Sequence, residues 1–402
     1  MKKTRWIILL IFAFIIGFLF SFLVYNGYWY RFINGIKTLA WYEYILLIIL
    51  TFLITLTVHE LGHLFSMVFQ GVRIRALYLY MVMFYKTKKG WRIKLKPRFW
   101  YLVGGFVVPD LGIIKDDESY QKLVTRFANS LKAGPIVTIA FLGLTNLMFL
   151  LSIAFNWNSN LIGILSLLNF YTIILSSLYI KSFKLSNASF YGDFIAYKKM
   201  KEDKLFQIIE INQYRSFSLV ESNETDQYLF NLTQKMMKES ELKTTLFYQM
   251  LIISYIEGVC YHNYKDDEEI KAKLLRYPLG SHFRNEQGIT LLYELALYFY
   301  HLGLVEKSYK LIEDIKKKAN PKIDEKMRIY LEKKYTHILH IEDYEDYLNT
   351  EKNYSFGLAG LFEDLIDMDE MTKEMHAKRP FQPWFTEVHM IQEEENKRSD
   401  SN

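Results

Sequence analysis

A single apolar segment that carries ionisable side chains constrains this chain more than any other feature. Residues 41–72 read WYEYILLIILTFLITLTVHELGHLFSMVFQGV, which is long enough for a helix to cross about 30 Å of hydrocarbon. Near its end lie His59, Glu60 and His63, in the pattern HExxH. Ionisable groups are costly inside a membrane and usually serve a function there. We therefore expect a membrane protein with a chemical site on this helix.

Four apolar segments are long enough to span a bilayer. They are predicted at about residues 5–25, 42–69, 130–154 and 160–182. The first follows MKKTR and resembles a signal peptide, but its apolar run is too long and no small-residue cleavage site follows it. We interpret it as a retained anchor, so residues 1–199 form a predicted transmembrane domain.

The positions of basic residues predict the orientation, because positively charged loops stay on the cytoplasmic side. Residues 71–100 contain many Lys and Arg but no acidic residue, and Lys181 and Lys184 follow the fourth span. The loop NWNSN between the third and fourth spans is uncharged. We expect a multi-pass protein of the cell membrane with its N-terminus and C-terminal domain in the cytoplasm. The Lys-, Ile- and Asn-rich usage suggests a bacterial cell.

Short strands are predicted between the second and third spans. VRIRALYLYMVMFY is rich in β-branched and aromatic residues, WRIKLK alternates apolar and basic residues, and KTKKG suits a turn between them. We expect a membrane-associated β-hairpin over about 72–96. The following YLVGGFVVP carries a Gly-Gly pair and ends at Pro109, which predicts irregular backbone.

The HExxH pattern is typical of a zinc site. On a helix, His59 and His63 lie one turn apart on the same face, where two imidazoles can bind one Zn²⁺. Glu60 projects beside them and can accept a proton from a zinc-bound water. Two alternatives are a pair of hydrogen-bonded core histidines and a proton relay.

A third zinc ligand has to be a carboxylate, because the other seven of the nine histidines lie beyond residue 260. Besides Glu60, the acidic residues before position 200 are Glu43, Asp110, Asp116, Asp117, Glu118 and Asp193. Glu43 is 16 residues from His59, or about 24 Å along a helix, and cannot reach. We predict that residues 116–118 form a solvated loop. Two candidates for the third ligand remain. Asp110 lies in a turn context, and Asp193 lies just after the fourth span, at the depth of the histidines.

The order of these motifs resembles the site-2 protease family of intramembrane zinc metalloproteases over roughly residues 40–200. HELGH lies in a predicted span, GGF follows at 104–106, AGPIVTIAF opens the next helix, and LLNFYTIIL precedes a late aspartate. The resemblance implies that Asp193 is the third zinc ligand and that substrate contacts come from Gly104, Gly105, Gly134, Pro135 and Asn169. Two positions depart from the family pattern: Gly192 precedes the aspartate rather than following it, and Thr138 stands where the family often has Asn.

The resemblance implies an intramembrane zinc metalloendopeptidase that binds one catalytic Zn²⁺ and uses Glu60 as its base. Its partner would be a membrane-embedded protein or peptide, cut in or near a transmembrane segment during signalling or peptide maturation. The predicted strands could hold that substrate extended. An alternative, non-enzymatic function is that of a catalytically silent membrane adaptor, which binds partners through its polar half.

The polar half, residues 200–390, predicts an all-α cytosolic domain that could dock a cytosolic regulator. ITLLYELALYFYHLGLVEKSYKLIEDIKKK predicts two amphipathic helices around a turn at Leu302 and Gly303, as in a tetratricopeptide unit or an ordinary helical bundle. Residues 391–402 predict a disordered tail. A formal charge of +5 with no basic patch excludes a nucleic-acid partner, and the single cysteine, Cys260, excludes an internal disulfide.

Overall fold

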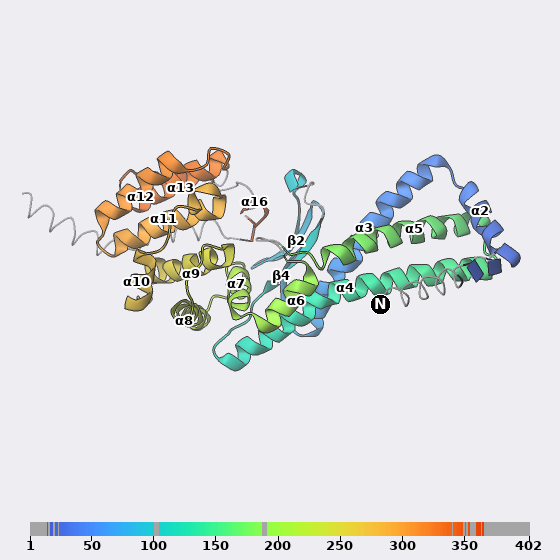
Figure 1. The fold of residues 1–402 in the computed structure, drawn as a ribbon, viewed down its shortest axis with the longest axis horizontal. Helices are drawn as coiled ribbons and strands as arrows, with labels where there is room; N and C mark the ends of the chain where they lie inside the picture. Colours follow the sequence, from blue (N-terminus) through green and yellow to red (C-terminus); the bar gives the residue numbers. More distant parts are fainter. Residues whose placement is uncertain are drawn as a thin grey trace, which may run out of the picture.

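Three long apolar helices form the membrane part of the chain. In the computed structural model they are α3 (Trp41–Phe69), α4 (Asp117–Ala154) and α5 (Ser159–Ser182), preceded by α2 (Tyr28–Lys37) (Figure 1). Length and composition allow α3, α4 and α5 each to cross a membrane. The predicted spans at about 42–69, 130–154 and 160–182 each fall within one of these helices.

The structure describes most of the chain between residues 24 and 348. The described ranges are 24–99, 104–186, 191–339 and 341–348, with residues 14, 17, 18, 21, 22, 350, 353, 359–362, 364 and 365. Of the 21 residues of the predicted first span at 5–25, 14 lie outside these residues. The predicted tail at 391–402 also lies outside them.

Helix α4 begins well before its apolar part. Asp116 is its N-cap and accepts a hydrogen bond from Ser119 N, and two further acids occupy the first turn. Negative charge at a helix N-terminus is stabilised by the free N–H groups and the helix dipole. The prediction that residues 116–118 form a solvated loop is therefore wrong, because these acids start a helix.

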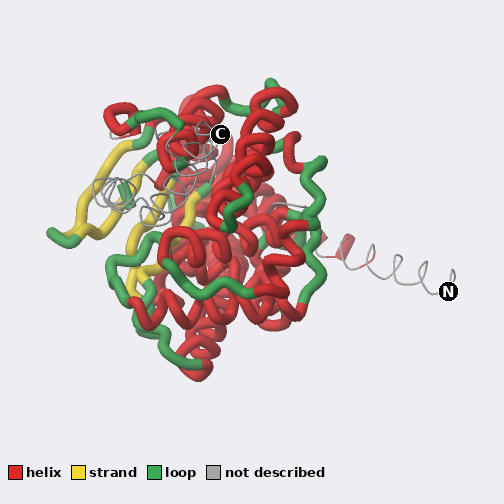
Figure 2. The backbone as a smooth tube through the Cα atoms, turned by 90° about the vertical axis from the view of Figure 1, so that its left-hand side faces the viewer, coloured by secondary structure: helices red, strands yellow, loops and turns green. Residues whose placement is uncertain are grey.

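An antiparallel sheet lies between the membrane helices and the polar half (Figure 1). Figure 2 shows its strands in yellow, to one side of the helices. Its strands are β1 (Arg73–Leu79), β2 (Val82–Thr87), β3 (Gly90–Leu95) and β4 (Gly105–Asp110), in the order β3-β2-β1-β4. The predicted hairpin at 72–96 is part of this sheet. Lys88 and Lys89 form its turn, and Gly90 follows with φ 113°, a conformation that glycine adopts readily.

Strand β4 corrects the prediction of irregular backbone before Pro109. Residues 105–110 pair with β1, with a register shift between Ile74 and Ala76. Pro109 lies opposite Ile74 beside that shift, in an edge strand of the described sheet, where a missing N–H is tolerated. Gly105, the second glycine of the pair, therefore starts a strand.

The rest of the described chain is helical. A short 3-10 turn, η1 (Pro97–Phe99), ends the hairpin region. The helices that follow are α6 (Asp193–Glu202), α7 (Lys204–Arg215), α8 (Asn223–Glu239), α9 (Leu246–His262), α10 (Glu268–Leu275), η2 (His282–Arg284), α11 (Glu286–His301), α12 (Val305–Lys318), α13 (Glu325–Ile338), α14 (Glu345–Leu348) and α16 (Ala359–Phe362). The predicted turn at Leu302 and Gly303 separates α11 from α12, and Gly303 has φ 79°.

The polar half packs directly on the membrane half. Ile114 N donates to Thr225 Oγ1 at 2.9 Å, and Tyr228 OH donates to a carboxylate oxygen of Asp117 at 2.6 Å. Phe127 of α4 meets Tyr214 of α7 edge to face, with ring centroids 5.4 Å apart. One hydrophobic core runs from the sheet and α4 into α9 and α11. The two halves are therefore joined through buried contacts.

Candidate metal centre

Three side chains from two distant segments meet at the polar end of the membrane helices. His59 and His63 lie on α3, and Asp193 is the first residue of α6. Asp193 Oδ2 lies 3.2 Å from His59 Nε2 and 3.7 Å from His63 Nε2, and the two Nε2 atoms are 3.1 Å apart. Among the described residues, this is the group of His, Cys, Asp and Glu that could hold a metal ion.

A hydrogen-bond chain fixes the tautomer of His59. Thr138 Oγ1 lies 3.0 Å from Gly134 O, which can only accept, and 2.9 Å from His59 Nδ1; with its one proton on the bond to Gly134 O, the hydroxyl accepts from His59 Nδ1–H. The proton of the neutral ring is then on Nδ1. The Nε2 lone pair is left to face His63 and Asp193.

His63 is oriented in the same way from α4. Its Nδ1 lies 2.8 Å from Ser130 O, an acceptor, so this nitrogen carries the proton. Two Nε2 lone pairs and a carboxylate oxygen thus converge, and they repel one another unless a cation lies between them. Ligand atoms around a tetrahedral zinc ion with bonds of 2.0–2.1 Å are about 3.3 Å apart. The three residues fit such an ion and leave a fourth position open.

Aromatic rings hold His59 from the α5 side. Phe183 stacks on the imidazole with a centroid distance of 5.1 Å and an angle of 8°, and Tyr179 stacks at 6.2 Å and 7°. His59 is only 6% exposed. The ring therefore has no room to turn away from the site.

Two glycines let α3 and α4 cross closely at the site. A Cβ added to Gly62 would lie 3.0 Å from the Cα of Gly134. A Cβ added to Gly134 would lie 2.3 Å from His63 Nε2, well inside contact distance. Small residues at a membrane-helix crossing bring backbones together. Because Gly134 has no side chain, the imidazole of His63 can lie directly against α4.

Glu60 lies beside the histidines and against the sheet. It is 5% exposed, and the backbone N–H of Gly105, at the start of β4, hydrogen-bonds its carboxylate. A Cβ on Gly105 would lie 2.6 Å from Glu60 Cγ. The Gly105 position predicted from the sequence therefore borders the carboxylate that could act as a base.

The turn before α6 places Asp193. Gly192 N donates to Leu185 O at 2.9 Å, and a Cβ on Gly192 would lie 2.2 Å from Ser182 O at the end of α5. Only glycine fits this close approach. The glycine that precedes the aspartate therefore packs α6 against α5.

The other predicted site residues lie apart from the three ligands or have other contacts. Asp110 is 3% exposed and accepts from Ser218 Oγ and Leu219 N, each at 2.9 Å, so it binds the polar half. Asn169 donates to Asn146 Oδ1 at 3.3 Å between α5 and α4. Pro135 is buried within α4, and Gly104 is half-buried, with no atom of the described part of the chain within 4 Å of an added Cβ.

Sequence reasoning missed the contacts that orient the ligands. Thr138 is noticed in the sequence only as a departure from a family pattern, yet it lies one helical turn after Gly134 and faces the same site. Ser130 acts through its backbone carbonyl, which leaves no signal in the residue type. Phe183 and Tyr179 are not distinguishable from other aromatic residues of a membrane helix.

Two histidines and a glutamate on one long apolar helix, with an aspartate from the start of α6 close to both histidines, are the arrangement expected of a membrane metallopeptidase. The family model described as peptidase family M50 matches residues 47–331. The chain belongs to this family, the site-2 protease family. The match runs from α3 to α13 and includes the whole cluster. Comparisons with curated proteins and with solved structures found no match.

Proposed function

We propose that the protein is an intramembrane zinc endopeptidase that hydrolyses peptide bonds in or near the transmembrane segments of membrane proteins. The observation that carries the proposal is that His59 and His63, with Glu60 beside them, lie on a helix able to cross a membrane and converge with Asp193 from the start of α6. Family membership makes the protein a metallopeptidase. Zinc as the metal and the bilayer as the site of cleavage are our inference.

His59, His63 and Asp193 would hold one Zn²⁺ through two ring nitrogens and a carboxylate oxygen. When bound, such an ion supplies Lewis acidity that polarises a carbonyl and makes water a nucleophile near neutral pH. Thr138 and Ser130 O keep the proton of each imidazole on Nδ1, so that both Nε2 atoms stay available as ligands.

Glu60 serves as the general base and acid of the proposed reaction. It accepts the proton that the attacking water loses, and it donates this proton to the leaving amine. Its burial and its hydrogen bond from Gly105 N hold the carboxylate next to the histidines. Removal of a positioned general base typically costs 10²- to 10⁴-fold in rate.

The sheet is the proposed substrate platform. β4 is a terminal strand of the described sheet, and its first residue, Gly105, contacts Glu60. A substrate segment that unwinds and adds as a strand at this edge would present its carbonyls beside Glu60. Unwinding is needed because the carbonyls of a helix are covered by its own hydrogen bonds.

The proposed topology has four spans, with residues 5–25 as the first, and both termini in the cytoplasm. The basic residues at 71–100 lie in and around strands β1 to β3 and in η1, which would put the sheet and the metal centre at the cytoplasmic side. Residues 1–199 would form the protease domain and residues 200–390 a cytosolic helical domain. A bacterial cell membrane is the proposed location.

The test compares Glu60→Gln with Glu43→Gln, the same change at the other acid of α3. Glu43 caps the start of the helix, where its carboxylate accepts from Ala40 N at 2.6 Å. Purified Glu60→Gln protein should keep one zinc per chain and lose cleavage, whereas Glu43→Gln should keep both. Membrane peptides that accumulate in cells with Glu60→Gln would identify substrates. Zinc retained with cleavage unchanged in Glu60→Gln would overturn the proposed mechanism, and zinc-loaded wild-type protein that cleaves no membrane peptide would favour an adaptor.

A further inference from the structure

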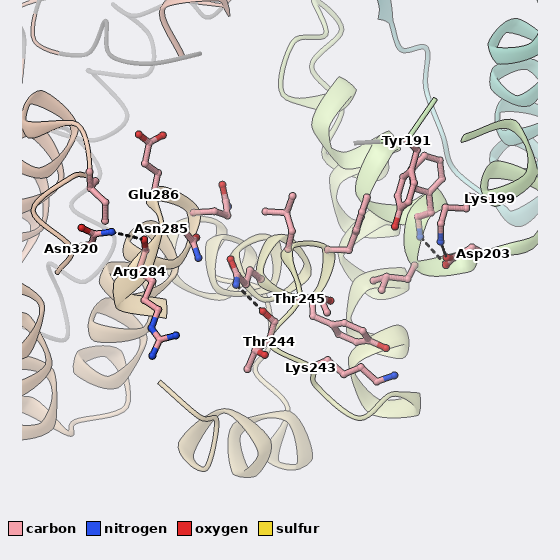
Figure 3. Close-up of a pocket in the computed structure, with 18 of the residues that line it drawn as sticks. Tyr191, Lys199, Asp203, Lys243, Thr244, Thr245, Arg284, Asn285, Glu286 and Asn320 are labelled. Carbon is pink, nitrogen blue, oxygen red and sulfur yellow. Dashed lines mark hydrogen bonds and ion pairs between the residues drawn. The ribbon is translucent and has the colours of Figure 1, made fainter. Parts of the chain in front are cut away.

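A groove on the polar half shares a helix with the metal centre. It has a volume of about 1030 Å³ and lies between α6 and α7 on one side and the start of α11 on the other, with the start of α9 between them (Figure 3). Its wall begins at Tyr191, two residues before Asp193, and continues along α6 through Lys199. A ligand in this groove would therefore be linked to the metal centre by one helix.

The groove is positively charged. Four cationic and two acidic side chains line it, so its net charge is +2. Lys199 and Asp203 lie 2.8 Å apart and neutralise each other, and the other acid is Glu286. The three remaining cations, Lys243, Arg284 and Lys322, are exposed and form no ion pair with any residue that the structure describes. These charges attract an anionic ligand.

The floor near α6 is aromatic. Phe247 of α9 stacks on Tyr191 at 5.5 Å and packs on Phe206 at 5.6 Å, and Tyr191 meets Phe206 at 5.7 Å. Such rings offer apolar contact area for aliphatic or aromatic side chains of a ligand. A purely ionic ligand would leave this surface unused.

The start of α9 adds groups that suit a peptide backbone. Thr245, its N-cap, makes no side-chain hydrogen bond to the helix, and no acid lies in the first turn. The amide nitrogen of Gln249 donates to Thr244 O at 2.9 Å, while its carbonyl oxygen has no donor among the described residues. Helix N–H groups need acceptors and a free carbonyl needs a donor. A peptide supplies both.

We propose that this groove binds an acidic peptide segment with interspersed apolar side chains, namely the polar flank of the membrane substrate whose span is cut at the metal centre. The inference rests on the proposed function and names the class of substrate. Charge complementarity brings the flank to Lys243, Arg284 and Lys322. Its apolar side chains pack on the aromatic floor, and its backbone leads past Tyr191 towards Asp193.

The experiment measures binding without cleavage. Full-length protein carrying Glu60→Gln is titrated, in detergent, against a fluorescein-labelled twelve-residue peptide of alternating glutamate and leucine. Charge reversal of Lys243, Arg284 and Lys322 to glutamate should weaken binding roughly tenfold, or about 1.4 kcal/mol, because three weak attractions are lost and three weak repulsions are added. The same peptide with lysine in place of glutamate should not bind.

A matched control reverses Lys265, Lys310 and Lys326, which are exposed and lie outside the groove. It changes the net charge equally and should leave peptide affinity unchanged. Equal loss in both triple variants, or no loss in either, would overturn the proposal. Displacement of the peptide by anionic phospholipid vesicles but not by excess unlabelled peptide would assign the groove to a lipid headgroup and also overturn it.

The two proposals fail in different ways. If Glu60→Gln leaves cleavage unchanged, the protease mechanism is wrong whether or not the peptide binds. If Glu60→Gln abolishes cleavage but the groove variant binds the peptide normally, the mechanism stands and the groove assignment is wrong. Where both hold, the groove variant should cut a substrate with an acidic flank less efficiently through a higher KM, with little change in kcat.

Discussion

At the scale of single residues, the metal centre depends on side chains that would not touch the ion. The Nδ1 partners of the two histidines differ: a threonine hydroxyl for His59 and a backbone carbonyl for His63. Partners of this kind fix ring orientation and raise ligand basicity, and their loss typically costs 10- to 100-fold in metal affinity. Only the threonine hydroxyl can be removed by substitution, because a backbone carbonyl is present whatever the side chain.

Replacement of Thr138 should therefore weaken metal binding without unfolding the protein. Thr138→Val keeps the side-chain shape but removes the oxygen that accepts from His59 Nδ1, so zinc affinity should fall about 10- to 100-fold. Competition with a chromogenic chelator measures the affinity. Thr138→Ser should restore most of it. Thr145→Val, in the same helix at a hydroxyl bonded only to Leu142 O, is the control and should bind zinc normally.

Gly134 allows a second test on the same helix. Gly134→Ala places a methyl group 2.3 Å from His63 Nε2, so the imidazole has to move and zinc binding should be lost. Gly143→Ala is the matched control, because no atom of the described residues lies within 4 Å of its added Cβ. An exposed helical glycine replaced by alanine usually gains up to about 1 kcal/mol. Zinc-to-protein ratio and melting temperature report both effects, and normal zinc content in Gly134→Ala would contradict the packing argument.

At the scale of elements, the apolar helices were the easiest to predict and the sheet edge was the hardest. Long apolar runs fix α3 and α5 almost to the residue, since nothing else suits twenty apolar side chains in a row. The sequence at 101–109 looked irregular because glycine and proline are rare inside strands. Tertiary pairing with β1 overrides that local preference.

The sequence leaves Asp110 and Asp193 as candidates for the third zinc ligand, and substitution of each should distinguish them. Asp193→Ala should remove zinc, since Asp193 Oδ2 faces both histidine nitrogens. Asp110→Ala should keep zinc but lower stability by about 1–3 kcal/mol, because Leu219 N and Ser218 Oγ lose a buried acceptor. Zinc content and thermal unfolding of both variants decide the matter. Loss of zinc only in Asp110→Ala would reverse the assignment.

At the scale of the whole molecule, sequence reasoning found the HExxH half of the site and needed a family resemblance for the other half. His59 and His63 are one turn apart, so helix geometry alone brings them together. Asp193 lies 130 residues after His63 in the sequence, and its position depends on how α5, Gly192 and α6 pack. Spacing cannot encode such a contact, because it is set by tertiary packing.

The proposed orientation can be tested because the chain has one cysteine and it is buried. Cys260 lies at 0% exposure in α9, so cysteines introduced at the surface can be labelled selectively. Ser159 and Lys310 are exposed, the first at the uncharged turn between α4 and α5 and the second on α12. In intact cells, a membrane-impermeant maleimide should label Ser159→Cys and not Lys310→Cys, and both should react after lysis. The positive-inside rule predicts this pattern because basic residues flank the ends opposite Ser159. Labelling of Lys310→Cys alone in intact cells would place the polar half outside, and with it the groove and the metal centre.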